Sequence, residues 1–455
     1  MSVVTRIPPS PTGRFHIGTA RTALFNYLFA RHHGGRFLFR SEDTDKTRSK
    51  KEHEDEILEG LAWLGLHHDG FSRQSEHAPR HRELLEKLIR EGKAYESEEP
   101  GKDDPTKTVR VLRLKNPGTT ITFRDEIRGD VTFDTAELGD FVIAKSLDEP
   151  LYHLAVVVDD ADAGVTHVIR GEDHISNTPR QILIQEALGM PRPIYAHLPL
   201  ILDAKRAKLS KRTGATSVMD YRDEGILPEA LINYLAMLGW NPGTPQEYFS
   251  LAELIELFTL EGVHKGGAAW DREKLLSVNQ HWMRELSDSD FLAHVWDIGS
   301  PTSDVGLPMS LHSAILEKAV PLLKERARTF QEAREMLSGE LACLFAEEPV
   351  LDRGILTAKE PFERSGTTKS ALESLSEAIQ ALPENVSVET VKETIMPLAE
   401  AEEAKGKGGR GAVLWPLRYA LSGQERSPDP FTLISILGKE ESISRIRKAV
   451  AILEG

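Results

Sequence analysis

Two short segments, far apart in the sequence, carry the residue types that phosphate chemistry needs. The first, residues 6–19, reads RIPPSPTGRFHIGT and follows a short apolar run. This order predicts a strand, a turn and the start of a helix, where unpaired N–H groups and the helix dipole favour phosphate. There His16 can donate to a phosphate oxygen, and Gly18 has no Cβ, so a flat adenine ring could approach the backbone. On spacing alone, an ordinary strand-to-helix connection with a surface histidine is the simpler interpretation.

The second segment, Lys208-Leu209-Ser210-Lys211-Arg212, lies in a predicted loop after a strand. Two lysines three residues apart can reach a triphosphate from the side opposite a helix start, because lysine is a mobile point charge. The pair of segments suits adenylyl transfer, in which a carboxylate attacks the α-phosphate of ATP and pyrophosphate leaves. Since the nucleophile is already ionised, catalysis needs only positioning and stabilisation of the developing charge.

The elements around these segments alternate between strand and helix. In the first helix, an apolar face is predicted at residues 20–28. Helices are predicted at about residues 19–31, 57–64, 78–90 and 178–188, and strands at about 3–7, 36–40, 152–160, 166–169 and 195–202. Between the two groups, a loop is predicted at 97–104, and short, mostly antiparallel strands at 108–114, 121–123, 131–133 and 141–145. The pattern predicts an α/β, split Rossmann-like domain with an inserted small domain at the edge of its sheet, followed by a mostly helical region.

Length and composition set limits on what the chain can be. The 455 residues suffice for more than one domain, and 40% hydrophobic with 28% charged residues describe a globular protein. No apolar run is long enough for a membrane span, and the N-terminus leads directly into the first motif, so we expect no membrane, no targeting peptide and a cytoplasmic protein. The one cysteine, Cys343, excludes a disulfide or a cysteine-based zinc site within one chain. A net charge of -15 argues against indiscriminate nucleic-acid binding.

The two segments resemble the signatures of a known family. Residues 9–19 are similar to the HIGH motif of class I aminoacyl-tRNA synthetases, and residues 208–212 are similar to their KMSKS loop. Further segments resemble the bacterial-type glutamyl-tRNA synthetase branch over nearly the whole chain: Thr5-Arg6-Ile7, Phe25-Asn26-Tyr27, Glu42-Asp43-Thr44-Asp45, Trp63-Leu64-Gly65-Leu66, Tyr152-His153-Leu154, Val157-Val158-Asp159-Asp160, Val168-Ile169-Arg170, residues 227–235 and residues 415–423.

The resemblance implies an activity and partners. It implies an ATP-dependent ligase that attaches L-glutamate to the 3′ end of tRNA-Glu through a glutamyl-adenylate, using ATP with Mg²⁺ and no zinc, as a monomer. One alternative is a non-discriminating enzyme that also charges tRNA-Gln. Another is a duplicated synthetase retained as a tRNA-binding or regulatory protein. Truncated relatives that modify tRNA-Asp normally lack the helical C-terminal half, so residues 290–455 argue against that option.

The resemblance also implies roles for individual residues. It makes His16, Gly18, Lys208 and Lys211 catalytic, and it assigns ATP binding to Thr12, His16, Gly18, Lys208, Ser210 and Lys211. It assigns glutamate binding to Arg6, Pro8, Ser10, Glu42, Tyr152 and Arg170, with Arg6 and Tyr152 at the γ-carboxylate, Ser10 and Glu42 at the α-ammonium, and Arg170 at the α-carboxylate. Two carboxylates and one ammonium do call for two arginines and one acid. The sequence leaves open which arginine takes which carboxylate, whether both arginines instead form structural ion pairs, and whether Glu42 is a helix N-cap or an acid near tRNA.

Five parts are expected on this basis. The catalytic domain is expected in two halves, residues 1–95 and 151–215, with the acceptor-end-binding insertion between them at 96–150. A helical stem-contact domain is expected at 216–288. A helical anticodon-binding region is expected at 289–455, with a break near 380–390. The segment 97–109 is shorter than is usual in the family and lacks the cysteines that bind zinc in some members. Thr19 replaces the second histidine of the HIGH motif. Arg326 lies near where some members read the third anticodon base, although an exposed helical arginine is usually only solvated.

Overall fold

The computed structural model describes residues 2–101, 106–203, 205–207, 209, 217–297, 313–358, 367–404 and 409–454. The chain forms two compact units, Met1–Asn279 and Gln280–Gly455. The first unit contains all the strands described below, and the second is helical. In the part of the chain that the structure describes, no helix is both long and apolar enough to cross a membrane.

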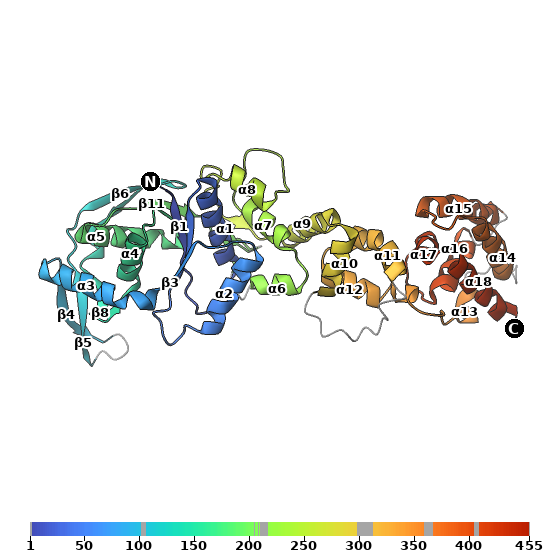
Figure 1. Ribbon diagram of the computed structural model, residues 1–455, viewed down its shortest axis with the longest axis horizontal. Helices are drawn as coiled ribbons and strands as arrows, with labels where there is room; N and C mark the ends of the chain where they lie inside the picture. The colour runs from blue at the N-terminus through green and yellow to red at the C-terminus, as the bar shows by residue number, and fades with distance from the viewer. Residues whose placement is uncertain are drawn as a thin grey trace. The chain divides into compact units, whose positions relative to one another are not determined.

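A parallel sheet forms the centre of the first unit (Figure 1). Its five strands are β1 (Val4–Ile7), β2 (Arg36–Ser41), β3 (Gly70–Arg73), β10 (His167–Gly171) and β11 (Ile194–Leu198). The strands β1 and β10 lie side by side, because the Thr166 N–H donates to the Val4 carbonyl at 3.0 Å and the Val4 N–H donates to Thr166 Oγ1 at 2.8 Å. The order is therefore β3-β2-β1-β10-β11, which confirms the predicted Rossmann-like arrangement.

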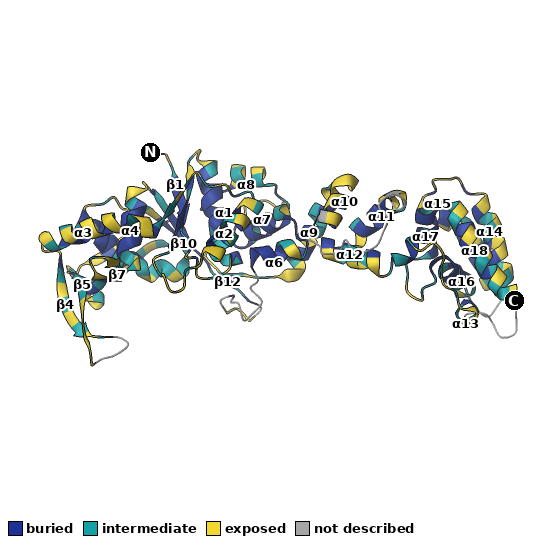
Figure 2. Cartoon of the chain, turned by 60° about the horizontal axis from the view of Figure 1, so that its bottom comes forward, coloured by how far each residue is buried: buried dark blue, intermediate teal, exposed yellow. Residues whose placement is uncertain are grey.

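The helix that follows β1 is buried more completely than its sequence predicted. α1 (Ile17–His32) buries every residue from Ala23 to Ala30, and not the predicted apolar face alone (Figure 2). The reason is that α1 lies between the sheet and the helices α7 (Pro228–Met237) and α8 (Leu251–Leu257). The rings of Phe25 and Phe258, for example, are 5.1 Å apart.

One predicted strand is wrong. Residues 152–160 form a helix, α4 (Tyr152–Asp162), although Val156-Val157-Val158 favoured a strand. Every residue from Leu154 to Asp160 is buried, so the segment shows neither the period of a helix nor that of a strand. The predicted strand at 195–202 is also interrupted, since β11 ends at Leu198 and a separate strand, β12 (Ile201–Leu202), pairs with β13 (Ala268–Ala269).

The inserted segment contains two groups of strands. β4 (Ala94–Pro100), β5 (Thr108–Leu114), β8 (Phe141–Ser146) and β9 (Glu149–Pro150) form an antiparallel sheet, so residues 97–100 are strand and not the predicted loop. The hairpin of β6 (Thr120–Asp125) and β7 (Gly129–Asp134) joins the parallel sheet beside β11, through a pairing of Asp125 with Tyr195. The insertion therefore lies at the edge of the sheet, as predicted, and also extends that sheet.

The remaining helices in the described part of the first unit cover the sheet or follow it. They are α2 (Lys51–Trp63), η1 (Gln74–His77), α3 (Ala78–Arg90), η2 (Thr135–Leu138), η3 (Glu172–Asn177), α5 (Thr178–Leu188), α6 (Val218–Asp223) and α9 (Arg272–Glu285), the last of which continues into the second unit. The bounds of α3 and α5 coincide with the predicted ones.

The described part of the second unit is entirely helical, as expected. Its helices are α10 (Asp288–Asp297), α11 (Ser313–Arg326), α12 (Phe330–Ser338), η5 (Ala342–Leu344), α13 (Arg353–Leu356), α14 (Thr367–Gln380), α15 (Val388–Ala404), α16 (Gly411–Ser422), α17 (Pro430–Leu437) and α18 (Lys439–Glu454). Arg445 on α18 is buried and donates to the carbonyls of Cys343, Leu421 and Ala346, which binds three segments of this unit together.

Candidate active site

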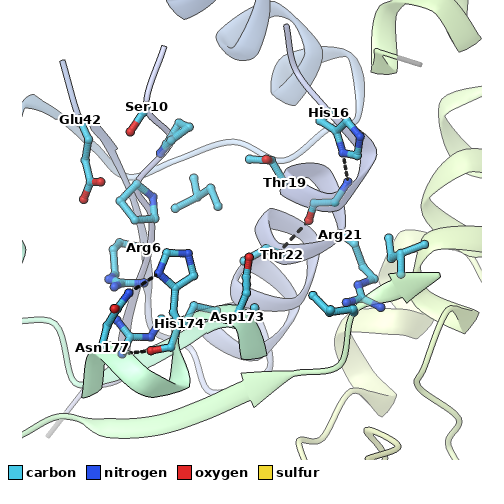
Figure 3. Close-up of a pocket in the computed structure, with 18 of the residues that line it drawn as sticks. Arg6, Ser10, His16, Thr19, Arg21, Thr22, Glu42, Asp173, His174 and Asn177 are labelled. Carbon is cyan, nitrogen blue, oxygen red and sulfur yellow. Dashed lines mark hydrogen bonds between the residues drawn. The ribbon is translucent and has the colours of Figure 1, made fainter. Parts of the chain in front are cut away.

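A cavity of about 640 Å³ lies where β1 and β10 end (Figure 3). The strand order reverses between these two strands, since the chain proceeds outward from β1 to β3 and then returns to β10. Ligands of doubly wound sheets bind at such a reversal, beyond the carboxyl ends of the strands. The cavity walls come from the segment after β1, the start of α1, the segment after β2, the start of α4, and the segments after β10 and β11.

Most of the residues predicted for the site line this cavity. They are Arg6, Pro8, Ser10, His16, Gly18, Glu42, Tyr152 and Arg170. Thr12 is not among the described lining residues, and its N–H donates to the Ser10 carbonyl at 2.8 Å within the turn. Lys208, Ser210 and Lys211 lie outside the described residues.

Arg6 forms a structural ion pair and also lines the cavity. Its Nε lies 3.1 and 3.2 Å from the two carboxylate oxygens of Asp160, and its Nη2 lies 3.1 Å from Asp160 Oδ2. Arg40 Nη1 donates to the same carboxylate at 2.7 Å. The third nitrogen of Arg6, Nη1, is buried without a hydrogen-bond partner among the described residues. An unpaired cationic donor beside a cavity suits an anionic ligand.

Glu42 places a carboxylate in the wall of the cavity. It is buried, its N–H donates to the Pro9 carbonyl at 2.9 Å, and its carboxylate lies 3.3 Å from Arg40 Nη2. It is not a helix N-cap, because α2 begins nine residues later, after Lys50. Burial raises the pKa of Glu42 despite the opposing effect of Arg40 and Arg6. The cost of its buried charge falls when a cation binds nearby.

Arg170, at the end of β10, is held by two side chains. Its Nη2 donates to Thr178 Oγ1 at 2.8 Å, and its Nε donates to His197 Nε2 at 3.1 Å. Its guanidinium also lies over the ring of Tyr195, 5.6 Å from the ring centre. Burial lowers the pKa of Arg170, yet an arginine in this position stays charged at neutral pH. A buried cation facing a cavity is a strong attractor for a carboxylate.

The sequence did not assign several residues that line the cavity. These are Ile7, Pro9, Thr19, Arg21, Thr22, Gly171, Asp173, His174, Asn177, Pro199, Leu200, Ile201 and Leu209. Tyr152 Oη lies 3.5 Å from His174 Nδ1, and Asn177 Nδ2 lies 3.2 Å from the same nitrogen, so α4 and η3 meet at the cavity wall. The polar run directly after β10 was a usable signal, since it follows the end of a parallel strand as Glu42 does.

His16 and Gly18 form the start of α1 as predicted, with an additional contact between them. His16 is the N-cap, and its Nδ1 accepts from the Gly18 N–H at 3.0 Å. In the neutral imidazole the proton then resides on Nε2, which makes that nitrogen a donor. A Cβ added to Gly18 would lie 3.3 Å from His16 Nδ1, so a larger residue here requires the histidine ring to shift by a few tenths of an ångström.

One group of side chains outside the cavity has the composition of a metal site. His77, His81 and Asp159 bring three potential ligand atoms within 4.8 Å of one another. The two histidines lie 2.9 and 2.7 Å from the same oxygen, Asp159 Oδ1, and Gln74 donates to the other oxygen at 2.8 Å. These contacts have the length of hydrogen bonds, and they satisfy both oxygens of the buried carboxylate without a metal.

Arg326 lies at the end of α11, in the second unit. Its side chain is 39% exposed, and its Nη1 lies 3.3 Å from Glu340 Oε1. This contact is a surface ion pair, and such pairs contribute little to stability.

Two family models match the chain. The model described as "tRNA synthetases class I (E and Q), catalytic domain" matches residues 2–107 and 97–277, and the model described as "Anticodon binding domain" matches residues 290–450. Together they span most of both units.

Curated proteins and solved structures give the same result. The chain is 42% identical to glutamate–tRNA ligase 1 of Erythrobacter litoralis, over 98% of this chain and 95% of that protein. It is 40% identical to the glutamate–tRNA ligase of Syntrophobacter fumaroxidans, over 99% and 98%. The crystal structure of a glutamate tRNA ligase from Elizabethkingia meningosepticum, in complex with its amino acid, matches with a TM-score of 0.82 and 32% identity over the whole of both chains. This chain therefore belongs to the glutamate–tRNA ligase family of class I aminoacyl-tRNA synthetases.

Proposed function

We propose that this chain catalyses the ATP-dependent attachment of L-glutamate to the 3′ end of tRNA-Glu. The observation that carries the proposal is the cavity between β1 and β10, where the buried side chains of Arg6, Arg170 and Glu42 lie beside a helix start. A ligand with two carboxylates and one ammonium matches these charges, and a triphosphate matches the helix start. Family membership supports the same activity.

Glutamate is proposed to bind at the end of the cavity formed by β1, β10 and α4. Arg6 and Tyr152 would face its γ-carboxylate, Ser10 and Glu42 its ammonium, and Arg170 its α-carboxylate. The unpaired Nη1 of Arg6 supports the first assignment, since a carboxylate would supply the partner that this buried donor lacks. The raised pKa of Glu42 supports the second, because a neighbouring ammonium would favour the ionised carboxylate.

ATP is proposed to bind along the start of α1. The N–H groups there and the Nε2 donor of His16 would face the phosphates, while Gly18 leaves space for the adenine to approach the backbone. Leu200, Ile201 and Leu209 give the cavity an apolar wall against which an adenine could pack. Thr12, Lys208, Ser210 and Lys211 are assigned to ATP from their motifs alone. Mg²⁺ would arrive with the triphosphate, whose oxygens are its usual ligands.

The reaction would proceed in two steps. In the first, an α-carboxylate oxygen of glutamate forms a bond to the α-phosphorus, and the bond to the β-phosphate oxygen breaks, releasing pyrophosphate. In the second, a ribose hydroxyl at the tRNA 3′ end attacks the activated carbonyl, loses its proton, and displaces AMP. The cationic groups of the site stabilise the charge that develops on phosphate oxygens in the first step.

Recognition of tRNA is proposed to follow the five-part division of the chain. The insertion at 96–150 would meet the acceptor end, 216–288 the stem, and 289–455 the anticodon, with Arg326 a candidate for its third base. The ion pair of Arg326 with Glu340 is weak enough to open for a nucleotide. The chain would act as a cytoplasmic monomer. Charging of tRNA-Gln as well is the second candidate activity.

A charging assay with the full chain and purified tRNA-Glu, tRNA-Gln and tRNA-Asp tests this proposal. Glutamylation of tRNA-Glu is expected, and the result with tRNA-Gln distinguishes a discriminating from a non-discriminating enzyme. If no tRNA is glutamylated and pyrophosphate exchange with tRNA present is also absent, the proposal is wrong and a tRNA-binding or regulatory role replaces it.

A further inference from the structure

A buried chain of hydrogen bonds connects the inserted segment to the arginine of the substrate cavity. Asp125, the last residue of β6, lies 2.6 Å from His197 Nδ1 through its Oδ2. The opposite ring nitrogen of His197, Nε2, lies 3.1 Å from Arg170 Nε. Asp125 is 1% exposed, His197 0% and Arg170 6%. Asp125 and His197 are therefore shielded from water, while Arg170 borders the cavity.

The direction of these hydrogen bonds determines the state of His197. The Nε of an arginine always carries a proton, so His197 Nε2 must accept, and Nδ1 must then carry the proton that is donated to Asp125. Burial lowers the pKa of His197, although Asp125 opposes this effect, so the ring is neutral at neutral pH. Asp125 thus holds the ring proton of His197 on Nδ1, and Nε2 is left as the acceptor for Arg170.

Asp125 is itself held in one orientation. Its Oδ1 accepts from three backbone N–H groups, those of Ile127, Arg128 and His197, at 3.0, 2.9 and 3.2 Å. Oδ2 is thereby left to face the histidine ring. The carboxylate cannot rotate without losing backbone hydrogen bonds in a buried site.

We propose that Asp125 and His197 are positioning residues, which hold the Arg170 guanidinium in the orientation that binds a carboxylate of glutamate. Thr178 completes the arrangement, because its Oγ1 accepts from Arg170 Nη2 at 2.8 Å. Nε and Nη2 are thus engaged by the protein, and Nη1 is the nitrogen that these contacts leave for the substrate. The glutamate-binding part of this inference rests on the proposed function, whereas the histidine tautomer does not.

The substitution Asp125→Asn separates positioning from packing, because it preserves shape. The amide oxygen is expected to keep the position of Oδ1 and its three backbone N–H groups, so the amide NH₂ faces His197 Nδ1. That nitrogen must then accept, the ring proton moves to Nε2, and two donors, Nε2–H and the Arg170 Nε–H, face each other. Arg170 Nε then loses its acceptor, and the guanidinium is held through Nη2 by Thr178 and the His174 carbonyl.

Kinetics of pyrophosphate exchange are expected to show this loss as a change for one substrate only. KM for glutamate should rise at least about ten-fold in Asp125→Asn, because the charged Arg170 loses one buried hydrogen-bond partner. KM for ATP should stay within about two-fold of the wild-type value. Asp130→Asn is the matched control, because Asp130 is exposed on the same hairpin, and it should behave as wild type. Thr178→Val removes the side-chain acceptor of Arg170 Nη2 and should also raise KM for glutamate selectively.

A glutamine at position 197 has no tautomers, and its amide NH₂ can donate to the Asp125 carboxylate while its oxygen accepts from Arg170. The single variant His197→Gln is therefore expected to keep most of the glutamate affinity. Adding Asp125→Asn again brings two donor groups face to face and should remove that affinity. Equal changes in both KM values of Asp125→Asn, or loss of glutamate affinity in a His197→Gln variant that melts normally, would overturn the proposal.

¹⁵N NMR of the histidine rings in the full chain tests the tautomer independently of catalysis. Wild type should show His197 protonated on Nδ1, and Asp125→Asn should show it protonated on Nε2. If wild type makes no glutamyl-adenylate, the proposed function fails, and this tautomer change still decides whether Asp125 sets the state of His197. An unchanged tautomer in Asp125→Asn would contradict the inference even in an active enzyme.

Discussion

Arg6 and Asp160 form a bidentate ion pair at the wall of the cavity, with Arg6 Nε 3.1 Å from Asp160 Oδ1 and Nη2 3.1 Å from Oδ2. Asp160 comes from α4, the segment whose sequence favoured a strand, and it also accepts from Arg40 at 2.7 Å. One carboxylate thus holds two buried cations. The charge of Asp160 offsets the cost of burying the Arg6 guanidinium in the wall of the cavity.

Asp160→Asn is expected to destabilise the protein and to weaken glutamate binding. The amide keeps the shape but leaves two buried guanidinium groups without their shared anion, a loss of about 3–5 kcal/mol in the free energy of unfolding. Urea denaturation and KM for glutamate measure the two effects. Asp162→Asn, on the exposed side of the same helix, is the control and should change stability by less than 1 kcal/mol. Equal stability of both variants would contradict the role assigned to Asp160.

The stabilisation from Asp160 should also depend on pH. Burial raises its pKa, but Arg6 and Arg40 lower it by more, so the folded-state pKa lies below the ordinary 3.8. A group with a lowered pKa stabilises the fold above its unfolded value and loses that contribution as pH falls through the folded one. The stability difference between wild type and Asp160→Asn should therefore shrink below about pH 3.8. A difference that stays constant down to pH 2 would exclude this linkage.

Glu42→Gln is expected to stabilise the fold while it impairs function. The pKa of Glu42 is raised by burial, so its charge destabilises the free protein above the ordinary value of 4.5, and a neutral isostere removes that cost. The thermal midpoint at pH 7 should rise, and the difference from wild type should fall as pH is lowered through the raised pKa toward 4.5. KM for glutamate should rise about ten- to hundred-fold, as for loss of a buried charged partner. A lower midpoint at pH 7 would show that the ion pair with Arg40 outweighs the burial cost.

Two substitutions at His16 distinguish its helix cap from its role toward ATP. Asparagine is a good N-cap, so His16→Asn should keep stability within about 0.5 kcal/mol of wild type, whereas His16→Ala should cost about 1 kcal/mol. Both remove the ring donor, and both should reduce the rate of pyrophosphate exchange about 10²- to 10³-fold. Full activity in His16→Asn would mean that His16 serves only as the cap.

Lys211→Ala is expected to reduce the rate of adenylate formation about 10²- to 10³-fold without loss of the fold. The motif that contains Lys211 predicts that its ammonium group stabilises the negative charge that develops on the phosphates. Lys205→Ala is the control from the same stretch of chain, since Lys205 is exposed and contributes its backbone N–H to the Asp203 carboxylate. Single-turnover measurement of adenylate formation with tRNA present compares the two. A wild-type rate in Lys211→Ala would remove this lysine from the mechanism.

The sequence was most informative where chemistry and strand ends coincide. The family resemblance assigned Arg6, Glu42 and Arg170 to the site, and each of them closes or follows a parallel strand, where such ends converge on one edge of a sheet. Arg21 could not be predicted, because it lies within a helix and reaches the cavity only through the packing of α1 against the segment around Leu238, to whose carbonyl it donates at 3.0 Å.

The error at residues 152–160 has a related cause. A segment that is buried on all sides carries no alternation of polar and apolar residues, so Val156-Val157-Val158 could indicate a strand by composition alone. The link between Asp125 and His197 was also beyond the sequence, because it depends on β6 pairing with β11. The C-terminal part of the insertion, α4, β10 and α5 lie between these two strands in the sequence.

The parallel pairing of β6 with β11 has a consequence for protein engineering. An insertion that merely decorated a catalytic domain could be exchanged freely for the longer one of a relative. Here the last residue of β6 is part of the hydrogen-bonded support of Arg170, so a graft cut at the borders of the insertion would remove Asp125 together with the surface loops. A chimaera that replaces the whole insertion should retain activity toward the amino acid only when the transplanted segment places a carboxylate at the position of Asp125. A graft that is confined to the β4–β5 hairpin leaves Asp125 in place and should also retain this activity.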